Sequence, residues 1–138
     1  MILIVVYSLN QEKSPILYHN QCYLESVSCE LSLEGTDVVV DVTPFPVRIE
    51  EMIAINIKHA NQYVLKQVWV EGTNMFMGKL PVHISNSDTI NDRVKHSGEF
   101  FIGACSEPNM RWKLVFDLTD IESGQSQTMS VFFQTKRS

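Results

Sequence analysis

The sequence predicts an all-β protein, because short apolar runs alternate with polar residues at a period of two along most of the chain. Such alternation places successive side chains on opposite faces of a strand. No long stretch repeats its apolar residues at the helical period, and turn-forming residues interrupt the chain at short intervals. Seven or eight strands at this spacing predict an immunoglobulin-like antiparallel β-sandwich. A small closed β-barrel is the alternative.

The first predicted pair of strands is a hairpin. The alternating runs 27–33 and 37–43 flank a short turn at 34–36 that contains glycine, which is typical of a hairpin connection. The segment 44-PFP-46 is expected to end the second strand, because proline has no N–H to donate to a strand ladder.

The rest of the chain yields six more predicted strands and one predicted loop. The strands are expected at residues 52–59, 63–71, 80–85, 98–105, 110–119 and 127–135. The polar segment 86–97 is expected to be a loop. Within the strand at 63–71, one face is expected to carry Val64, Val68 and Val70, and the other Tyr63, Leu65 and Trp69. In the strand at 110–119, every second residue from Met110 to Leu118 is apolar, which predicts one buried face and one solvated face.

Length and charge limit the function classes. The chain has 138 residues, enough for one domain with an apolar core. Hydrophobic residues make up 44% and charged residues 20%, a globular composition. The net charge of −5 argues against a nucleic acid as the partner, because phosphate binding requires a concentrated basic face.

The N-terminal segment 1–14 is set apart from the single β-sandwich domain expected at 15–138. Its apolar run 1-MILIVVY-7 is shorter than the roughly 20 residues that span a membrane, and no basic residue precedes it as in a signal peptide. A first β-strand is one interpretation. The polar spacer 8-SLNQEKS-14 favours the other, the end of a truncated membrane anchor that would tether the domain.

The three cysteines are Cys22, Cys29 and Cys105, an odd number that leaves at least one thiol without an intramolecular partner. Cys22 and Cys29 can form a disulfide if the chain turns between them, which would imply an oxidising compartment and leave Cys105 free. Three buried, reduced cysteines are the alternative. A redox function for Cys22 and Cys29 is disfavoured because their spacing is unlike C-x-x-C.

Catalytic motifs are missing from the sequence, so an enzyme is not expected. There is no phosphate-binding loop, no G-x-S-x-G and no H-E-x-x-H. The four histidines, at positions 19, 59, 83 and 96, are scattered without the close spacing of a zinc site, and each is expected at the surface.

The candidate site lies in the segments 74-NMFMGKLP-81 and 105-CSEPNMRW-112. In an extended chain Met75 and Met77 project to the same side, and Gly78 then allows a sharp change of direction. Thioether and thiolate sulfurs select Cu(I) over harder ions. The proposed ligands are Met75, Met77, Cys105 and Met110, with Trp112 and Gly78 beside them. Packing of these side chains in the core is the alternative, since methionine fills irregular gaps.

The order of these motifs resembles a family of small proteobacterial envelope proteins. The elements that carry the resemblance are 22-CYLESVSCEL-31, Pro44-x-Pro46, 72-GTNMFMG-78 and 105-CSEPNMRW-112, and it covers about residues 20–118. The family is similar in style to the immunoglobulin-like copper-handling modules of the FixH and CopC type. The resemblance marks the two cysteines 22 and 29 together with the candidate copper site. The family's membrane segment is longer than 1-MILIVVY-7, which puts an anchor in this chain in doubt.

The resemblance therefore implies a periplasmic protein, or one anchored in the inner membrane and facing the periplasm. The expected function is a non-catalytic module that binds or delivers Cu(I) through methionine and cysteine sulfurs, serving a membrane or periplasmic protein partner. The alternative is a metal-free module for protein–protein interaction, held together by a structural disulfide.

Overall fold

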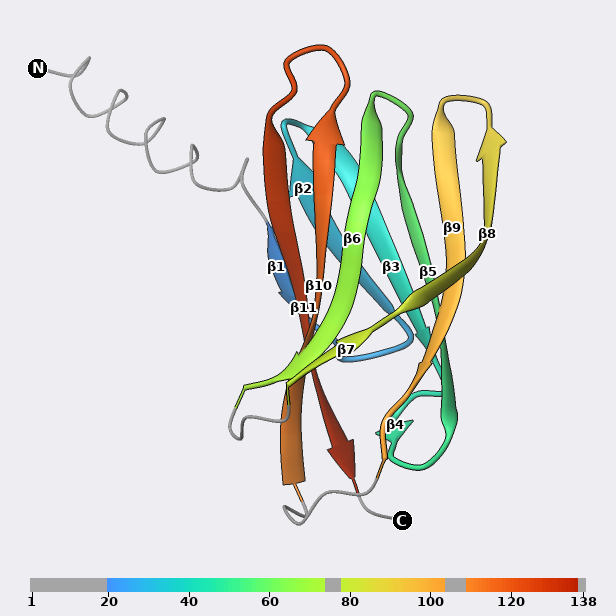
Figure 1. Cartoon of the computed structure of the whole chain (residues 1–138), viewed down its shortest axis with the longest axis vertical. Helices are drawn as coiled ribbons and strands as arrows, with labels where there is room; N and C mark the ends of the chain where they lie inside the picture. The colour runs from blue at the N-terminus through green and yellow to red at the C-terminus, as the bar shows by residue number, and fades with distance from the viewer. Residues whose placement is uncertain (1–19, 74–77, 104–108, 137–138) are drawn as a thin grey trace, which may run out of the picture.

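Eleven strands form the regular structure of this computed structural model, which describes residues 20–73, 78–103 and 109–136 (Figure 1). They are β1 (Gln21–Tyr23), β2 (Ser28–Leu33), β3 (Thr36–Thr43), β4 (Val47–Arg48), β5 (Met52–Ala60), β6 (Tyr63–Gly72), β7 (Lys79–Pro81), β8 (His83–Ile90), β9 (Arg93–Phe101), β10 (Asn109–Asp120) and β11 (Ser126–Lys136). β1, β4 and β7 have only two or three residues, so the longer strands number eight, as expected. Within these ranges no helix is long and apolar enough to cross a membrane.

The strands form two sheets that face each other (Figure 1). One sheet has the order β2-β3-β5-β9-β8, and the other has the order β1-β11-β10-β6-β7, with β4 also paired to β11. β1 and β4 run parallel to β11, whereas the other pairs are antiparallel. The described strands do not close into a barrel, so the fold is the expected β-sandwich.

The core lies between the sheets and follows the predicted alternation. In β5, Ile53, Ile55 and Ile57 are almost fully buried. The inner face of β10 carries the run from Met110 to Leu118 that was predicted to be buried, and each of its five apolar side chains is at most 1% exposed. Burial of a large apolar side chain stabilises the fold by about 1.5–3 kcal/mol, so these two strands supply much of the driving force.

β6 departs from the predicted alternation at its centre. Phe116 of β10 pairs with Val68, whereas Leu118 pairs with Leu65, so β6 has one extra residue at this point. This β-bulge turns Tyr63 inward before it and Val70 inward after it, both nearly fully buried. The prediction that Val64 shares a face with Val68 and Val70 is therefore wrong, because a single inserted residue reverses the side-chain parity.

The predicted loop at 86–97 is instead most of the β8–β9 hairpin. β8 is an edge strand, and apart from the half-buried Ile84 its side chains are exposed, so its polar sequence is compatible with strand structure. Asn91 takes a positive φ of 58° at the turn, a conformation that asparagine tolerates better than most residues. On β9, Gly98 lies so close to β8 that an added Cβ would be 2.5 Å from the carbonyl oxygen of His83.

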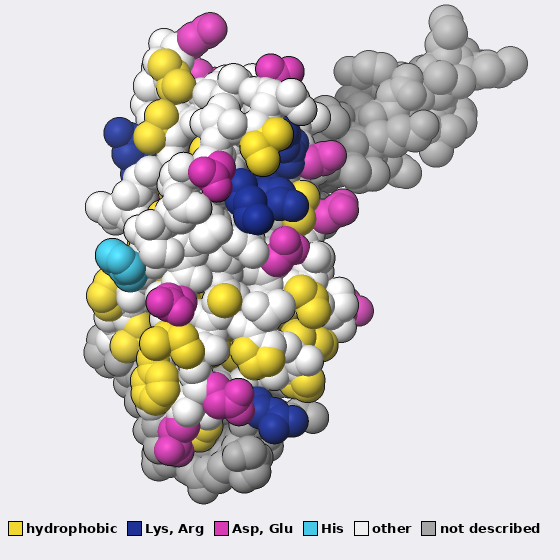
Figure 2. Space-filling view, turned by 90° about the vertical axis from the view of Figure 1, so that its right-hand side faces the viewer, with side chains coloured by type: hydrophobic (Ala, Val, Ile, Leu, Met, Phe, Trp, Pro, Cys, Tyr) yellow, Lys and Arg dark blue, Asp and Glu magenta, His cyan; other side chains and the backbone are white. Residues whose placement is uncertain are grey.

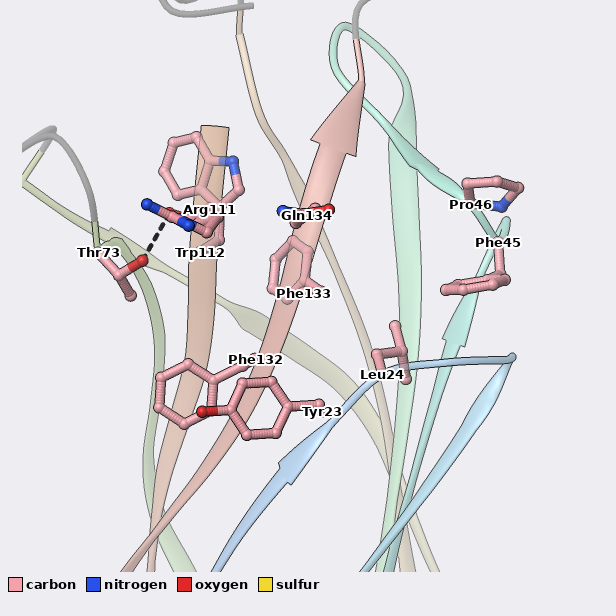
Figure 3. Close-up of a pocket in the computed structure, with 10 residues that line it drawn as sticks. All are labelled: Tyr23, Leu24, Phe45, Pro46, Thr73, Arg111, Trp112, Phe132, Phe133 and Gln134. Carbon is pink, nitrogen blue, oxygen red and sulfur yellow. Dashed lines mark hydrogen bonds between the residues drawn. The ribbon is translucent and has the colours of Figure 1, made fainter. Parts of the chain in front are cut away.

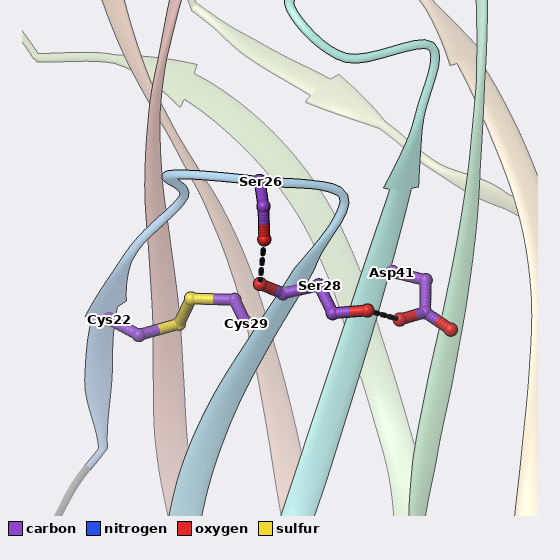
Figure 4. Close-up of a disulfide and its surroundings, with 5 residues drawn as sticks. All are labelled: Cys22, Ser26, Ser28, Cys29 and Asp41. Carbon is purple, nitrogen blue, oxygen red and sulfur yellow. Dashed lines mark hydrogen bonds between the residues drawn. A yellow bond between two sulfur atoms is a disulfide. The ribbon is translucent and has the colours of Figure 1, made fainter.

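The N-terminal strands tie the two sheets together. The predicted disulfide joins Cys22 of β1 to Cys29 of β2, with a Cα–Cα distance of 6.3 Å, and so links the edge of one sheet to the edge of the other (Figure 4). Beside it, the hydroxyl of Ser28 donates to the carboxylate of Asp41 on β3. Further along, Pro44 and Pro46 end β3 as predicted, and β4 then pairs with β11 of the opposite sheet.

Candidate functional site

The structure describes part of the predicted copper site. Met75, Met77 and Cys105 lie outside the described residues, whereas Gly78, Met110 and Trp112 lie within them. Gly78 has a positive φ of 78°, which fits the sharp change of direction expected before β7. Met110 is 0% exposed and Trp112 is 1% exposed, and both belong to the hydrophobic core.

The described residues that flank the two sulfur-bearing segments meet at one end of the sandwich (Figure 1). Gly72, at the end of β6, pairs with Trp112 near the start of β10. The backbone N–H of Thr73 donates to the carbonyl oxygen of Arg111 at 2.9 Å, and the Thr73 hydroxyl donates to the same oxygen at 3.2 Å. The chain therefore leaves β6 and enters β10 at adjacent positions.

A buried hydrogen bond fixes the Trp112 side chain at this end. Its indole Nε1–H donates to the hydroxyl oxygen of Thr135 on β11 at 2.9 Å, and Thr135 is 1% exposed. The Thr135 hydroxyl in turn faces the carbonyl oxygen of Met110 at 3.5 Å. Because the polar atom of the ring is satisfied inside the protein, Trp112 is held in one orientation.

An apolar groove of about 440 Å³ opens beside Trp112, along the edge of β11 between β1 and β4 (Figure 3). Aromatic side chains dominate its lining, which consists of Tyr23, Leu24, Phe45, Pro46, Thr73, Arg111, Trp112, Phe132, Phe133 and Gln134. The rings of Tyr23 and Phe132 stack with centroids 5.0 Å apart, yet Tyr23 remains 69% exposed. The groove is of a size that accommodates a small molecule or a few side chains of a partner.

The outer face of the same sheet carries a small charged cluster next to Trp69. The ammonium group of Lys79 lies 4.7 Å from the centre of the Trp69 ring, and the Trp69 indole donates to Glu71 at 3.2 Å. Lys113 forms an ion pair with Glu71 at 3.8 Å. These side chains lie on the solvent-facing side of the sheet and interact with one another, so the cluster is typical of a charged protein surface.

Sequence reasoning missed a pair of histidines. His59 is 1% exposed, which contradicts the expectation of a surface residue, and its Nε2 lies 2.9 Å from Nε2 of His96. Burial lowers the pKa of both rings, and the positive charge of Arg93 lowers the pKa of His59 further. A signal was present: His59 continues the buried alternation of Ile53, Ile55 and Ile57.

Among the described residues, no three histidine, cysteine, aspartate or glutamate side chains gather where they could hold a metal ion. Comparison with protein-family models, with curated proteins and with solved structures gave no match to the chain.

Proposed function

We propose that the protein is a non-catalytic binding module of the bacterial envelope that holds Cu(I) through the sulfurs of Met75, Met77 and Cys105. The observation that carries the proposal is the pair of hydrogen bonds from Thr73 to Arg111, which keeps the flanks of both sulfur-bearing segments together. Two thioethers and one thiolate form a donor set that prefers Cu(I) to harder cations.

Met110 takes a structural part in this proposal. The sequence predicts Met110 as a fourth ligand, but its side chain is fully buried on the inner face of β10, so we assign it to the core and not to the ligand set. Trp112, whose ring is fixed by Thr135, is a rigid apolar side chain next in sequence to Arg111. A rigid support is what a binding site needs if its ligands are to keep their geometry.

Two features support the envelope location and the immunoglobulin-like assignment. The Cys22–Cys29 disulfide fits a chain that folds in an oxidising compartment. The strand order supports an immunoglobulin-like sandwich, because β3, β5, β9 and β8 form one sheet, while β11, β10, β6 and β7 form the other. In this arrangement β4 is the short strand that passes from the first sheet to the edge of β11.

The copper proposal is tested by competition. The reduced protein is titrated against a chromophoric Cu(I) chelator, and the same titration is made with Met75→Leu/Met77→Leu. We expect the double variant to lose at least tenfold in affinity. Met52→Leu is the matched control, because Met52 is a surface methionine, 56% exposed, in the other sheet. Equal affinities for the wild type and the double variant would end the proposal.

A metal-free interaction module is the second candidate, and the groove of Figure 3 favours it. We propose as its occupant an extended segment of a partner protein that presents an aromatic side chain. The aromatic lining and the exposed ring of Tyr23 suit such a side chain.

This candidate can be examined by NMR with a pair of small probes. N-acetyltryptophan amide should shift the amide signals of groove residues at millimolar concentration, and N-acetylleucine amide, which lacks the aromatic ring, should bind more weakly. Tyr23→Ser should reduce the shifts, whereas Ile121→Ser, a change of an exposed apolar residue elsewhere, should not. Shifts spread over the surface, or shifts caused by self-association of the protein, would rule out this occupant.

A further inference from the structure

When both rings of the histidine pair are neutral, their hydrogen-bond partners fix which nitrogen of each ring carries the proton. Nδ1 of His59 lies 2.7 Å from the carbonyl oxygen of Ala60, which can only accept, so this nitrogen carries the proton. Nε2 of His59 is then a bare acceptor, and Nε2–H of His96 must donate to it across 2.9 Å. Nδ1 of His96 is left bare and accepts from the hydroxyl of Ser87 at 2.7 Å.

The first added proton fits this series of hydrogen bonds without moving a heavy atom. If Nδ1 of His96 takes the proton, His96 keeps its donation to His59, and its new N–H points at the Ser87 oxygen. A hydroxyl group can accept as well as donate, so rotation of the Ser87 O–H is sufficient. The positive charge then sits on the ring that is only partly buried, and it is shared with its neighbour.

The second proton does not fit. It would have to go to Nε2 of His59, the remaining bare nitrogen, and two N–H groups would then face each other across 2.9 Å. Two positive charges would also lie on stacked rings whose centres are 5.0 Å apart. Like charges in such a site cannot both be accommodated, so the rings must separate.

We propose that His59, His96 and Ser87 form a pH-operated latch that accepts one proton and opens with the second, releasing the β8–β9 hairpin from β5. The latch spans three adjacent strands, because His59 lies on β5, His96 on β9 and Ser87 on β8. Opening it weakens the sheet at the edge formed by β8. Figure 2 looks onto this side of the molecule, where histidine contributes only a small area of surface.

Among the residues that the structure describes, Arg93 is the one charged side chain outside the pair that shifts the pKa of either ring, and no carboxylate does so. Arg93 on β9 disfavours protonation of His59. Asp88 and Lys95 are a cross-strand pair next in sequence to Ser87 and His96, and so point to the opposite face of the sheet. On β6, Tyr63 faces inward at this end, and its hydroxyl donates to Glu34. The buried side chains that β3, β10 and β11 present at this end of the core are apolar: Val38, Val40, Leu118 and Met129.

The latch is tested by nitrogen NMR of the histidine side chains of the full chain between pH 8 and pH 4. We expect opposite tautomers at pH 8, with the proton on Nδ1 of His59 and on Nε2 of His96. As the pH falls, one proton should bind while the β8–β9 amides remain protected from hydrogen exchange. Binding of the second should coincide with at least a tenfold loss of that protection.

Two variants distinguish opening of the latch from acid-induced unfolding of the whole domain. His96→Gln keeps a donor toward His59 but removes one titrating group, so the acid-induced loss of protection in β8–β9 should shift to lower pH or disappear. His83→Gln alters an exposed histidine on β8 and should leave the transition unchanged. Identical tautomers in the two rings at pH 8, or an unchanged transition in His96→Gln, would overturn the proposal.

Discussion

Thr135 offers the sharpest single test of how the candidate site is supported. Thr135→Val keeps the shape of the side chain and removes the hydroxyl that accepts the Trp112 indole N–H at 2.9 Å. Both residues are 1% exposed, so no solvent is at hand to replace the lost acceptor. An orphaned buried donor costs about 1–3 kcal/mol, and we expect the free energy of unfolding to fall by that amount.

Urea denaturation followed by far-ultraviolet circular dichroism measures this loss, with Thr135→Ser as the control. Serine retains the hydroxyl and loses one methyl group, which should cost about 0.5–1.5 kcal/mol through packing alone. Trp112→Phe and the double variant complete a cycle, in which we expect a coupling of about 0.5–3 kcal/mol between the two side chains. A Thr135→Val protein as stable as the wild type, or a coupling of zero, would show that the hydrogen bond does not hold Trp112.

Three further predictions concern the rest of the fold. Replacing both Cys22 and Cys29 by alanine should lower the free energy of unfolding by about 2–3 kcal/mol, because the short closed loop no longer restricts the unfolded chain. Denaturation of the wild type with and without reductant measures the same loss, and equal stabilities would contradict the prediction. Burial lowers the pKa of His59 and His96, so their contribution to stability is complete above the unfolded pKa of about 6.5 and is lost as the pH falls below it. Each histidine that stays neutral in the folded state lowers the free energy of unfolding by up to about 1.4 kcal/mol for each pH unit below that value. A stability profile that is flat from pH 7 to pH 5 would refute this. Gly98→Ala should destabilise by about 1–3 kcal/mol, because its Cβ would meet the His83 backbone oxygen at 2.5 Å, and a thermal midpoint equal to that of the wild type would show that β8 can move aside.

The sequence predicted the parts of the fold in which alternation alone decides the structure. The strands containing Ile53, Ile55 and Ile57, and those following Met110 and Gln127, have one apolar face and were found within about one residue of their expected bounds. The fold class and the Cys22–Cys29 disulfide were also predicted.

Other features depend on contacts between distant strands, which a local pattern does not contain. The bulge in β6 is set by its pairing with Phe116 and Leu118 of β10, and so the buried face of β6 could not be assigned from its own residues. Residues 86–90 of β8 are polar and carry no apolar alternation, so the sequence predicts a loop there, whereas their pairing with β9 makes them part of a strand. His59 showed its burial in its alternation, but its partner His96 lay in the segment assigned to that loop.

For the candidate site, the sequence predicted a set of sulfur ligands, and the structure describes the ends of the chain segments that carry them. Thr73 and Arg111 connect those ends, while Met110 and Trp112 lie in the core beneath.

X-ray absorption of the protein loaded with one equivalent of Cu(I) tests the central claim most directly. We predict a copper ion surrounded by sulfur alone, with the number of sulfur neighbours reduced in Cys105→Ser and in Met75→Leu/Met77→Leu. Copper bound through nitrogen or oxygen, or a spectrum that is the same in the wild type and both variants, would contradict the account.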